Sequence, residues 1–133
     1  MEIRIKQGDR ASLSKTFTER EVLLFSELSE DRNPIHIDVA AGEASIFGAQ
    51  VVHGMLVASL ISGLLGLHLP GPGSIYLGQE LKFTAPVFIG DEITAVVEVT
   101  ALREDKPIAT LRTYCVNQAN KVVIDGVATV KLA

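Results

Sequence analysis

The stretch MLVASLISGLLGLHL, from Met55 to Leu69, decides the fold, because it is the longest apolar run in the chain and contains no Asp, Glu, Lys or Arg. It is shorter than the ~20 residues that a bilayer-spanning helix needs. The run Pro70-Gly71-Pro72-Gly73 follows directly and is a strong stop signal for a helix. A helix that is apolar nearly all round must be covered on most of its sides. We therefore expect a helix buried inside a globular domain, and no membrane span.

The residues after this helix have a different character. Four ranges are rich in β-branched residues and predict strands: 75–84, 92–103, 108–118 and 122–132. Polar connections at 103–107 and 119–121 are typical of hairpins. A curved antiparallel sheet can wrap around an apolar helix and cover it. We therefore predict an α+β fold, a single hotdog domain over residues 1–133, in which the sheet wraps around the long central helix.

The N-terminal part of the chain predicts a strand followed by a helix. Alternating residues predict a short strand at 11–17. Thr18 and Glu21 have the spacing of a capping box, so we expect a helix from about 19 to 29. Its predicted apolar stripe consists of Val22, Leu24, Phe25 and Leu28. The small, mixed residues of 39–51 predict one short helix or irregular turns.

Composition and charge exclude several classes of protein. The chain has 133 residues, a net charge of -4 at pH 7 and no basic run, which argues against nucleic acid or an anionic membrane surface as a partner. Cys115 is the only cysteine, so an intrachain disulfide and paired-cysteine metal sites are excluded. Residues 1–6 have mixed charge and lack the apolar core of a signal peptide. We therefore expect a protein of the reducing cytoplasm.

A second stretch, DRNPIHID from Asp31 to Asp38, concentrates polar groups that can do chemistry. Pro34 cannot donate a backbone hydrogen bond and disfavours the helical region for Asn33, so we expect a turn here and not a regular helix. An ordinary Asp is a carboxylate at neutral pH and an ordinary His is largely neutral. Asp31 and His36 could therefore hold and deprotonate a water together. Taken singly, Asp31 is better explained as a turn residue and His36 as a half-buried strand residue.

Three motifs carry a resemblance to a known family. The run Asp31-x-Asn33-Pro34-Ile35-His36-x-Asp38 resembles the hydratase motif of the MaoC-like R-specific enoyl-CoA hydratases. Val52-His53-Gly54-Met55-Leu56 resembles the start of that family's central helix. The following strand and turn are matched by Gln79, Phe83, Pro86-Val87 and Gly90-Asp91. The resemblance spans about residues 8–132 and suits the short, single-hotdog members. Three motifs in order are a stronger signal than one.

The resemblance implies the syn addition of water to a trans-2-enoyl-CoA, which gives an (R)-3-hydroxyacyl-CoA. It implies Asp31 and His36 as the catalytic pair, and coenzyme A is part of the substrate. We expect no further cofactor and no metal. The chemistry agrees, because water attack at Cβ and proton delivery to Cα occur on one face, where one cluster serves both. General acid–base help of this kind is worth ~10²–10⁴-fold. One role that the family suggests is precursor supply for polyhydroxyalkanoate synthesis.

The reaction also places negative charge on the thioester oxygen. Gly54 lies at the predicted start of the central helix, where free N–H groups and the positive end of the dipole point outward. Its N–H is the expected oxyanion donor, an interaction worth ~3–4 kcal/mol in enzymes, and the resemblance implies the same. The alternative is that Gly54 permits close packing. Asn33 either orients Asp31 or the water, or only shapes the turn, whereas His53 and Asp38 are expected to be structural.

The two ends of the substrate are marked less clearly. Leu65 and Val130 resemble family positions that line the acyl tunnel, a role that is compatible with plain core packing. Ser62 either contacts the acyl pocket or the catalytic pair, or bonds back to its own helix. The bulk of Leu65 favours a short acyl chain. Candidate contacts for the coenzyme A phosphates are better explained as a solvated charged face: Lys82, Arg103, Lys106 and Arg112.

Several other functions compete with hydration. A 3-hydroxyacyl thioester dehydratase runs the same reaction backward, and the sequence does not separate the two. Many hotdog thioesterases place a carboxylate on the central helix, and residues 54–69 contain none. A non-catalytic acyl-binding module would be expected to lack Asp31 or His36. A metal enzyme would need more clustered ligands than His36, Asp38 and a distant His53 supply.

Self-association is also expected from the predicted fold. A single small curved sheet leaves one long edge open and its central helix partly uncovered. Pairing two copies solves both problems, and closed two-fold dimers are the commonest soluble oligomers. The resemblance also implies a homodimer.

Overall fold

The computed structural model describes residues 4–133, so residues 1–3 of the predicted domain lie outside the described residues. Each predicted strand and helix is present, with bounds that differ by one or two residues from those expected. The elements in chain order are β1 (Arg10–Thr16), α1 (Glu19–Ser29), α2 (Pro34–Ile37), α3 (Val39–Ala44), α4 (Gly54–Leu67), β2 (Ile75–Phe83), β3 (Glu92–Leu102), β4 (Ile108–Val116) and β5 (Val122–Lys131).

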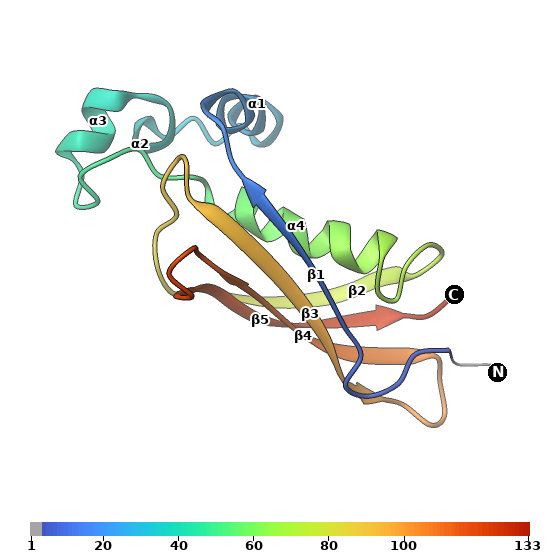
Figure 1. Cartoon of the computed structure of the whole chain (residues 1–133). Coiled ribbons are helices and arrows are strands. Elements are labelled where there is room, and N and C mark those ends of the chain that lie inside the picture. The colour runs from blue at the N-terminus through green and yellow to red at the C-terminus, as the bar shows by residue number, and fades with distance from the viewer. Residues whose placement is uncertain (1–3) are drawn as a thin grey trace.

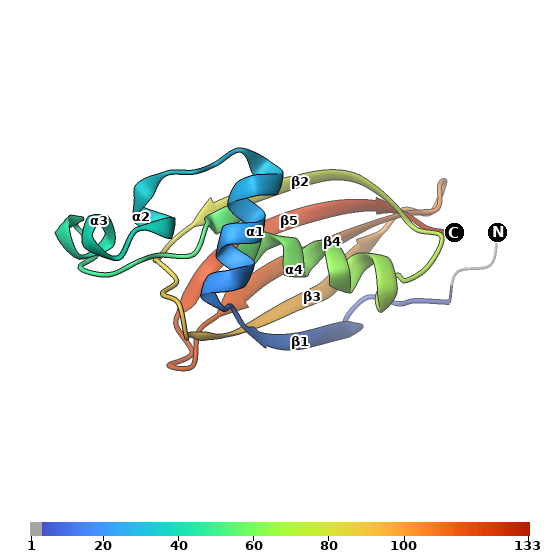
Figure 2. The ribbon, with the colours of Figure 1, turned by 90° about the horizontal axis from the view of Figure 1, so that it is seen from above.

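The five strands form one antiparallel sheet in the order β1-β3-β4-β5-β2. Its two edges are therefore β1, from the start of the chain, and β2, which follows the central helix. The sheet is curved, and α4 lies along its inner face, as Figures 1 and 2 show from two directions. This arrangement confirms the predicted α+β architecture. No helix within residues 4–133 is long and apolar enough to cross a membrane.

The core lies between α4 and the sheet. Ile61 and Leu64 of α4 and Ile93 of β3 have no exposed surface. Within residues 4–133 the opposite side of α4 is only partly covered, since Met55 is 58% exposed and Leu67 is 66% exposed. The central helix is thus buried on its sheet side and crossed by α1 over its first turns (Figure 2), and part of its outer surface is apolar and open.

Helix α1 confirms the predicted capping box and corrects the predicted apolar stripe. The Glu21 N–H donates to Thr18 Oγ1 at 3.2 Å, and the Thr18 N–H donates to Glu21 Oε1 at 3.1 Å. Val22 is buried as expected, but Leu28 is 83% exposed and Leu24 is also exposed, so their place in the stripe was wrong. Ser26, one turn after Val22, is buried instead. A hydroxyl is tolerated there because it hydrogen-bonds a buried histidine.

The segment between α1 and α4 lies beyond the end of the sheet, beside the start of α4 (Figure 2). The prediction that residues 31–38 form a turn and no regular helix was wrong in part, because Pro34–Ile37 form the one-turn helix α2. Proline is tolerated as the first residue of a helix, where its missing N–H would have no intrahelical partner. Residues 39–51 contain the short helix α3 followed by turns, which is one of the two predicted alternatives.

Candidate active site

A cavity of about 510 Å³ lies at the start of α4. Its walls come from the α2 segment, from the first turn of α4 and from the connection between β2 and β3. Most of the lining is apolar, including Phe47, Val52 and Phe83, and the side chains that can ionise there are Asp31, His36 and His53. The structure therefore brings the predicted catalytic pair and the predicted oxyanion donor Gly54 to one cavity.

Asp31 lies in the loop that leaves α1. Glu30 ends that helix in the left-handed conformation, with φ of 67°. The Asp31 N–H donates to Ser29 Oγ at 3.1 Å, and its carboxylate Oδ1 accepts from the Asn33 N–H at 3.2 Å. The Asp31 side chain is half exposed, so one carboxylate oxygen is held by the turn while the other faces the cavity and His36.

His36 lies on α2 and is buried. Its Nδ1 is 2.7 Å from the carbonyl oxygen of Val51. Because a carbonyl oxygen only accepts hydrogen bonds, Nδ1 carries the proton and a neutral His36 has a bare Nε2. That Nε2 lies 3.9 Å from Asp31 Oδ2. The two atoms are too far apart for a direct hydrogen bond and close enough for one water to contact both.

His53 is also part of this cluster, although the sequence predicted only a structural role. Its Nε2 lies 3.0 Å from the Asp31 carbonyl oxygen and 3.0 Å from Ser26 Oγ. Its ring stacks on that of His36, with centroids 3.9 Å apart and an interplanar angle of 27°. Burial lowers the pKa of His53, and the hydrogen bond to the Asp31 carbonyl opposes this effect. The motif Val52-His53-Gly54 marks the helix start in the sequence. The contact between His53 and Asp31 depends on the tertiary structure and has no local sequence signal.

Gly54 is the first residue of α4. The N–H groups of Leu56 and Val57 donate to the His53 carbonyl, so those of Gly54 and Met55 precede the first intrahelical bonds. The His53 side chain makes no capping hydrogen bond. A Cβ on Gly54 would lie 2.6 Å from ring carbons of Phe83. Both predicted explanations of Gly54 therefore have a structural basis: an available N–H facing the cavity, and close packing.

Asn33 and Asp38 both shape the backbone around α2. Asn33 Oδ1 accepts from the Ile35 N–H at 3.3 Å, which places Asn33 at the helix N-cap. Asp38 Oδ1 accepts from the Ala40 N–H at 3.0 Å and caps α3. The Asn33 side chain therefore shapes the turn by a direct hydrogen bond. The hydrogen bond from the Asn33 N–H to the Asp31 carboxylate is compatible with the orienting alternative, which stays a prediction.

The three predicted acyl-pocket residues lie away from this cavity. Leu65 and Val130 are buried between α4 and the sheet. Ser62 lines a second cavity of about 580 Å³, on the outer side of α4 next to β2, together with Phe25 and Met55. Among the described residues, none of the three lines the cavity that holds Asp31 and His36. Their acyl-binding role stays a prediction.

The absence of a metal also stays a prediction. Asp31, His36 and His53 each offer a ligand atom, and these atoms lie within 4.8 Å of one another. One nitrogen of each histidine is used to donate to a backbone carbonyl, which leaves one nitrogen per ring for other partners. The stacked arrangement of the rings fits a hydrogen-bonded cluster.

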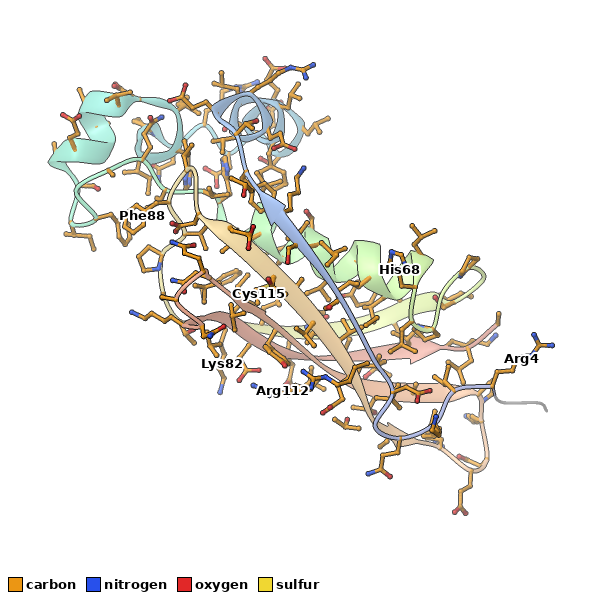
Figure 3. All side chains as sticks on the ribbon, in the orientation of Figure 1. Arg4, His68, Lys82, Phe88, Arg112 and Cys115 are labelled. Atoms are coloured by element: carbon orange, nitrogen blue, oxygen red, sulfur yellow. The ribbon has the colours of Figure 1, made fainter. Side chains whose placement is uncertain are left out.

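The predicted phosphate candidates lie on charged outer surfaces. Figure 3 shows Lys82 and Arg112 on the side of the sheet that faces away from α4. Arg112 pairs there with Asp125 at 3.3 Å, and Arg103 pairs with Asp105 at 2.6 Å in the hairpin after β3. These surroundings fit the interpretation of a solvated charged face.

Comparisons with known proteins identify the family. The model of the MaoC like domain matches residues 2–121. An (R)-specific enoyl-CoA hydratase of Aeromonas caviae is 58% identical over 128 residues, which are 96% of each chain. Another, of Rhodospirillum rubrum, is 51% identical over 95% of this chain and 87% of its own. A solved structure of an (R)-hydratase from A. caviae involved in PHA biosynthesis has a TM-score of 0.96, with 57% identity over 98% of each chain. This chain belongs to the MaoC-like family.

Proposed function

We propose that this protein is an R-specific enoyl-CoA hydratase, which adds water syn to a trans-2-enoyl-CoA to give an (R)-3-hydroxyacyl-CoA. One observation of the site carries the proposal: the bare Nε2 of His36 faces Asp31 Oδ2 at 3.9 Å on the wall of an apolar cavity. The similarity to (R)-specific enoyl-CoA hydratases over nearly the full chain supports it.

The reaction needs one water and two proton transfers. The water oxygen bonds to Cβ, and the π electrons of the C=C bond move toward the thioester oxygen. Asp31 and His36 together remove a proton from the water and return a proton to Cα on the same face, so the site ends in its original protonation state. Proton transfer by positioned side chains is worth ~10²–10⁴-fold.

The thioester oxygen gains negative charge during the attack. The Gly54 N–H, ahead of the first intrahelical bonds of α4, is the donor that we propose for it. It lies at the positive end of the helix dipole and lines the same cavity as the catalytic pair. A Cβ at this position would clash with the Phe83 ring, so only glycine fits beside this N–H.

A second copy of this chain is the partner that we propose for the outer face of α4 and the open edge β2. Large apolar side chains are exposed there: Met55, Leu67, Ile75 and Leu77. An unpaired strand edge and an apolar surface are both features that a dimer interface covers. Light scattering should give twice the mass of one chain, and Leu77→Arg should shift the protein to monomer. A monomeric wild type would contradict the homodimer.

The decisive experiment follows the loss of conjugated enoyl absorbance with trans-2-butenoyl-CoA. Wild type is compared with Asp31→Asn and His36→Ala, and release of free thiol is assayed in parallel. Absorbance loss without thiol release, abolished in both variants, is the expected result, and chiral analysis should identify the R product. Thiol release would instead identify a thioesterase. Inactivity of the dimeric protein on enoyl-CoAs of several chain lengths would overturn the proposal.

A further inference from the structure

His53 contacts three parts of the site at once. Its Nε2 reaches the Asp31 carbonyl oxygen, its ring stacks on His36, and the next residue in the chain is Gly54. Ser26 Oγ of α1 contacts the same Nε2, and Phe25 meets the ring edge-on at 4.8 Å. The side chain is 2% exposed, so these contacts leave it little freedom.

The hydrogen bonds define the state of the His53 ring. The Asp31 carbonyl can only accept, so Nε2 carries a proton and a neutral ring has a bare Nδ1. Among residues 4–133, that Nδ1 is the one buried side-chain N or O atom without a hydrogen-bond partner. Protonation would bury an N–H without an acceptor beside His36, and burial lowers the pKa of His53 accordingly. His53 is therefore a neutral donor to Asp31.

We propose that His53 is a positioning residue for hydration: its Nε2–H holds the Asp31 backbone, and with it the Asp31 carboxylate, in place against His36. This inference rests on the proposed function, which assigns the chemistry to Asp31 and His36. Asp31 needs such an anchor because it follows the end of α1 in a loop and its side chain is half exposed. Its N–H is held by Ser29 and its carbonyl by His53, so both ends of the residue are fixed. A displacement of about 1 Å at a catalytic group can cost ~10²-fold in rate.

Three substitutions separate the effect of the donor from that of the ring. His53→Gln keeps an N–H donor at about the distance of Nε2 and removes the ring, whereas His53→Met removes both. His53→Phe keeps a ring and lacks the donor. We expect kcat to fall about 10–100-fold in the Met and Phe variants, with KM changed less than about threefold, and kcat of the Gln variant to stay within about fivefold of wild type.

Asp31→Asn in each background shows whether the effect passes through Asp31. In the Met and Phe backgrounds Asp31→Asn should lower kcat much less than it does in wild type, because a displaced carboxylate already contributes less to the reaction. Equal losses in the Gln and Met variants, or fully multiplicative losses with Asp31→Asn, would overturn the inference. The inference would also be overturned if the Met and Phe variants failed to fold while the Gln variant folded. The His53 donor would then be required for folding and not specifically for positioning Asp31. An inactive wild type would overturn the proposed function together with this inference, whereas an active wild type with those results overturns the inference alone.

Discussion

The middle of α4 and its start are held in place by different interactions. Ile61 and Leu64 in the middle have no exposed surface and pack against apolar side chains of the sheet. His53 at the start is almost as inaccessible, but its contacts are directional hydrogen bonds and a ring stack. Apolar cores tolerate exchanges that conserve volume, whereas reacting groups lose rate when they move by an ångström. Substitutions in the middle of α4 should therefore change mainly the free energy of unfolding, whereas substitutions at its start should change mainly kcat.

The largest effect is expected from His36→Asn. The Asn Nδ2 can replace His36 Nδ1 as donor to the Val51 carbonyl, while nothing replaces the bare Nε2 that faces Asp31. We expect kcat to fall by ~10²–10⁴-fold, with the free energy of unfolding changed by less than about 1 kcal/mol. Enoyl absorbance and urea unfolding measure the two quantities. A variant that lost stability and activity together would show that the two regions are not separable at His36.

Leu64→Ala tests the other side of the comparison. Removing this fully buried side chain should lower the free energy of unfolding by about 2–5 kcal/mol, since the sheet cannot close over the cavity. The kcat per folded molecule should stay within about twofold of wild type when it is measured well below the melting temperature. Leu64→Met, which conserves volume, should cost less than about 1.5 kcal/mol. A large fall in kcat for folded Leu64→Ala would mean that packing in the middle of α4 also positions the site.

The same contrast explains what the sequence could predict. Apolar periodicity and β-branched runs mark α4 and β2–β5, because burial of a continuous apolar face leaves a local pattern. The sequence did not predict that Leu24 and Leu28 face solvent. When a helix contains several apolar residues, their spacing alone does not determine which of them pack against the core. The motifs pointed to Asp31, His36 and Gly54, which line one cavity in the structure, while their catalytic roles stay predictions. The contact of His53 with Asp31 and Ser26 joins residues 22 and 27 positions apart, for which no local pattern exists.

A smaller effect is expected from pH. Burial lowers the pKa of His53 in the folded state, whereas the unfolded chain has the ordinary value of ~6.5. Below about pH 6.5 the unfolded state binds a proton that the folded state does not, so this contribution to stability is complete above that pH and is lost as the pH falls. Its slope is at most ~1.4 kcal/mol per pH unit. Urea unfolding at pH 7.5, 6.5 and 5.5 should show a weaker pH dependence for His53→Gln than for wild type. Equal slopes would contradict a neutral buried His53.

The smallest effect is expected from Thr18→Ala, at the far end of the helix that supplies Ser26. The Thr18 hydroxyl accepts from the Glu21 N–H, and losing such a cap costs about 1 kcal/mol. Because Ser26 lies more than two turns farther along α1, its contact with His53 should persist and kcat should stay within about twofold of wild type. Thr18→Ser keeps the hydroxyl and should restore most of the stability. A parallel loss of kcat, recovered by Thr18→Ser, would extend the hydrogen-bonded region from the start of α4 through Ser26 into the whole of α1.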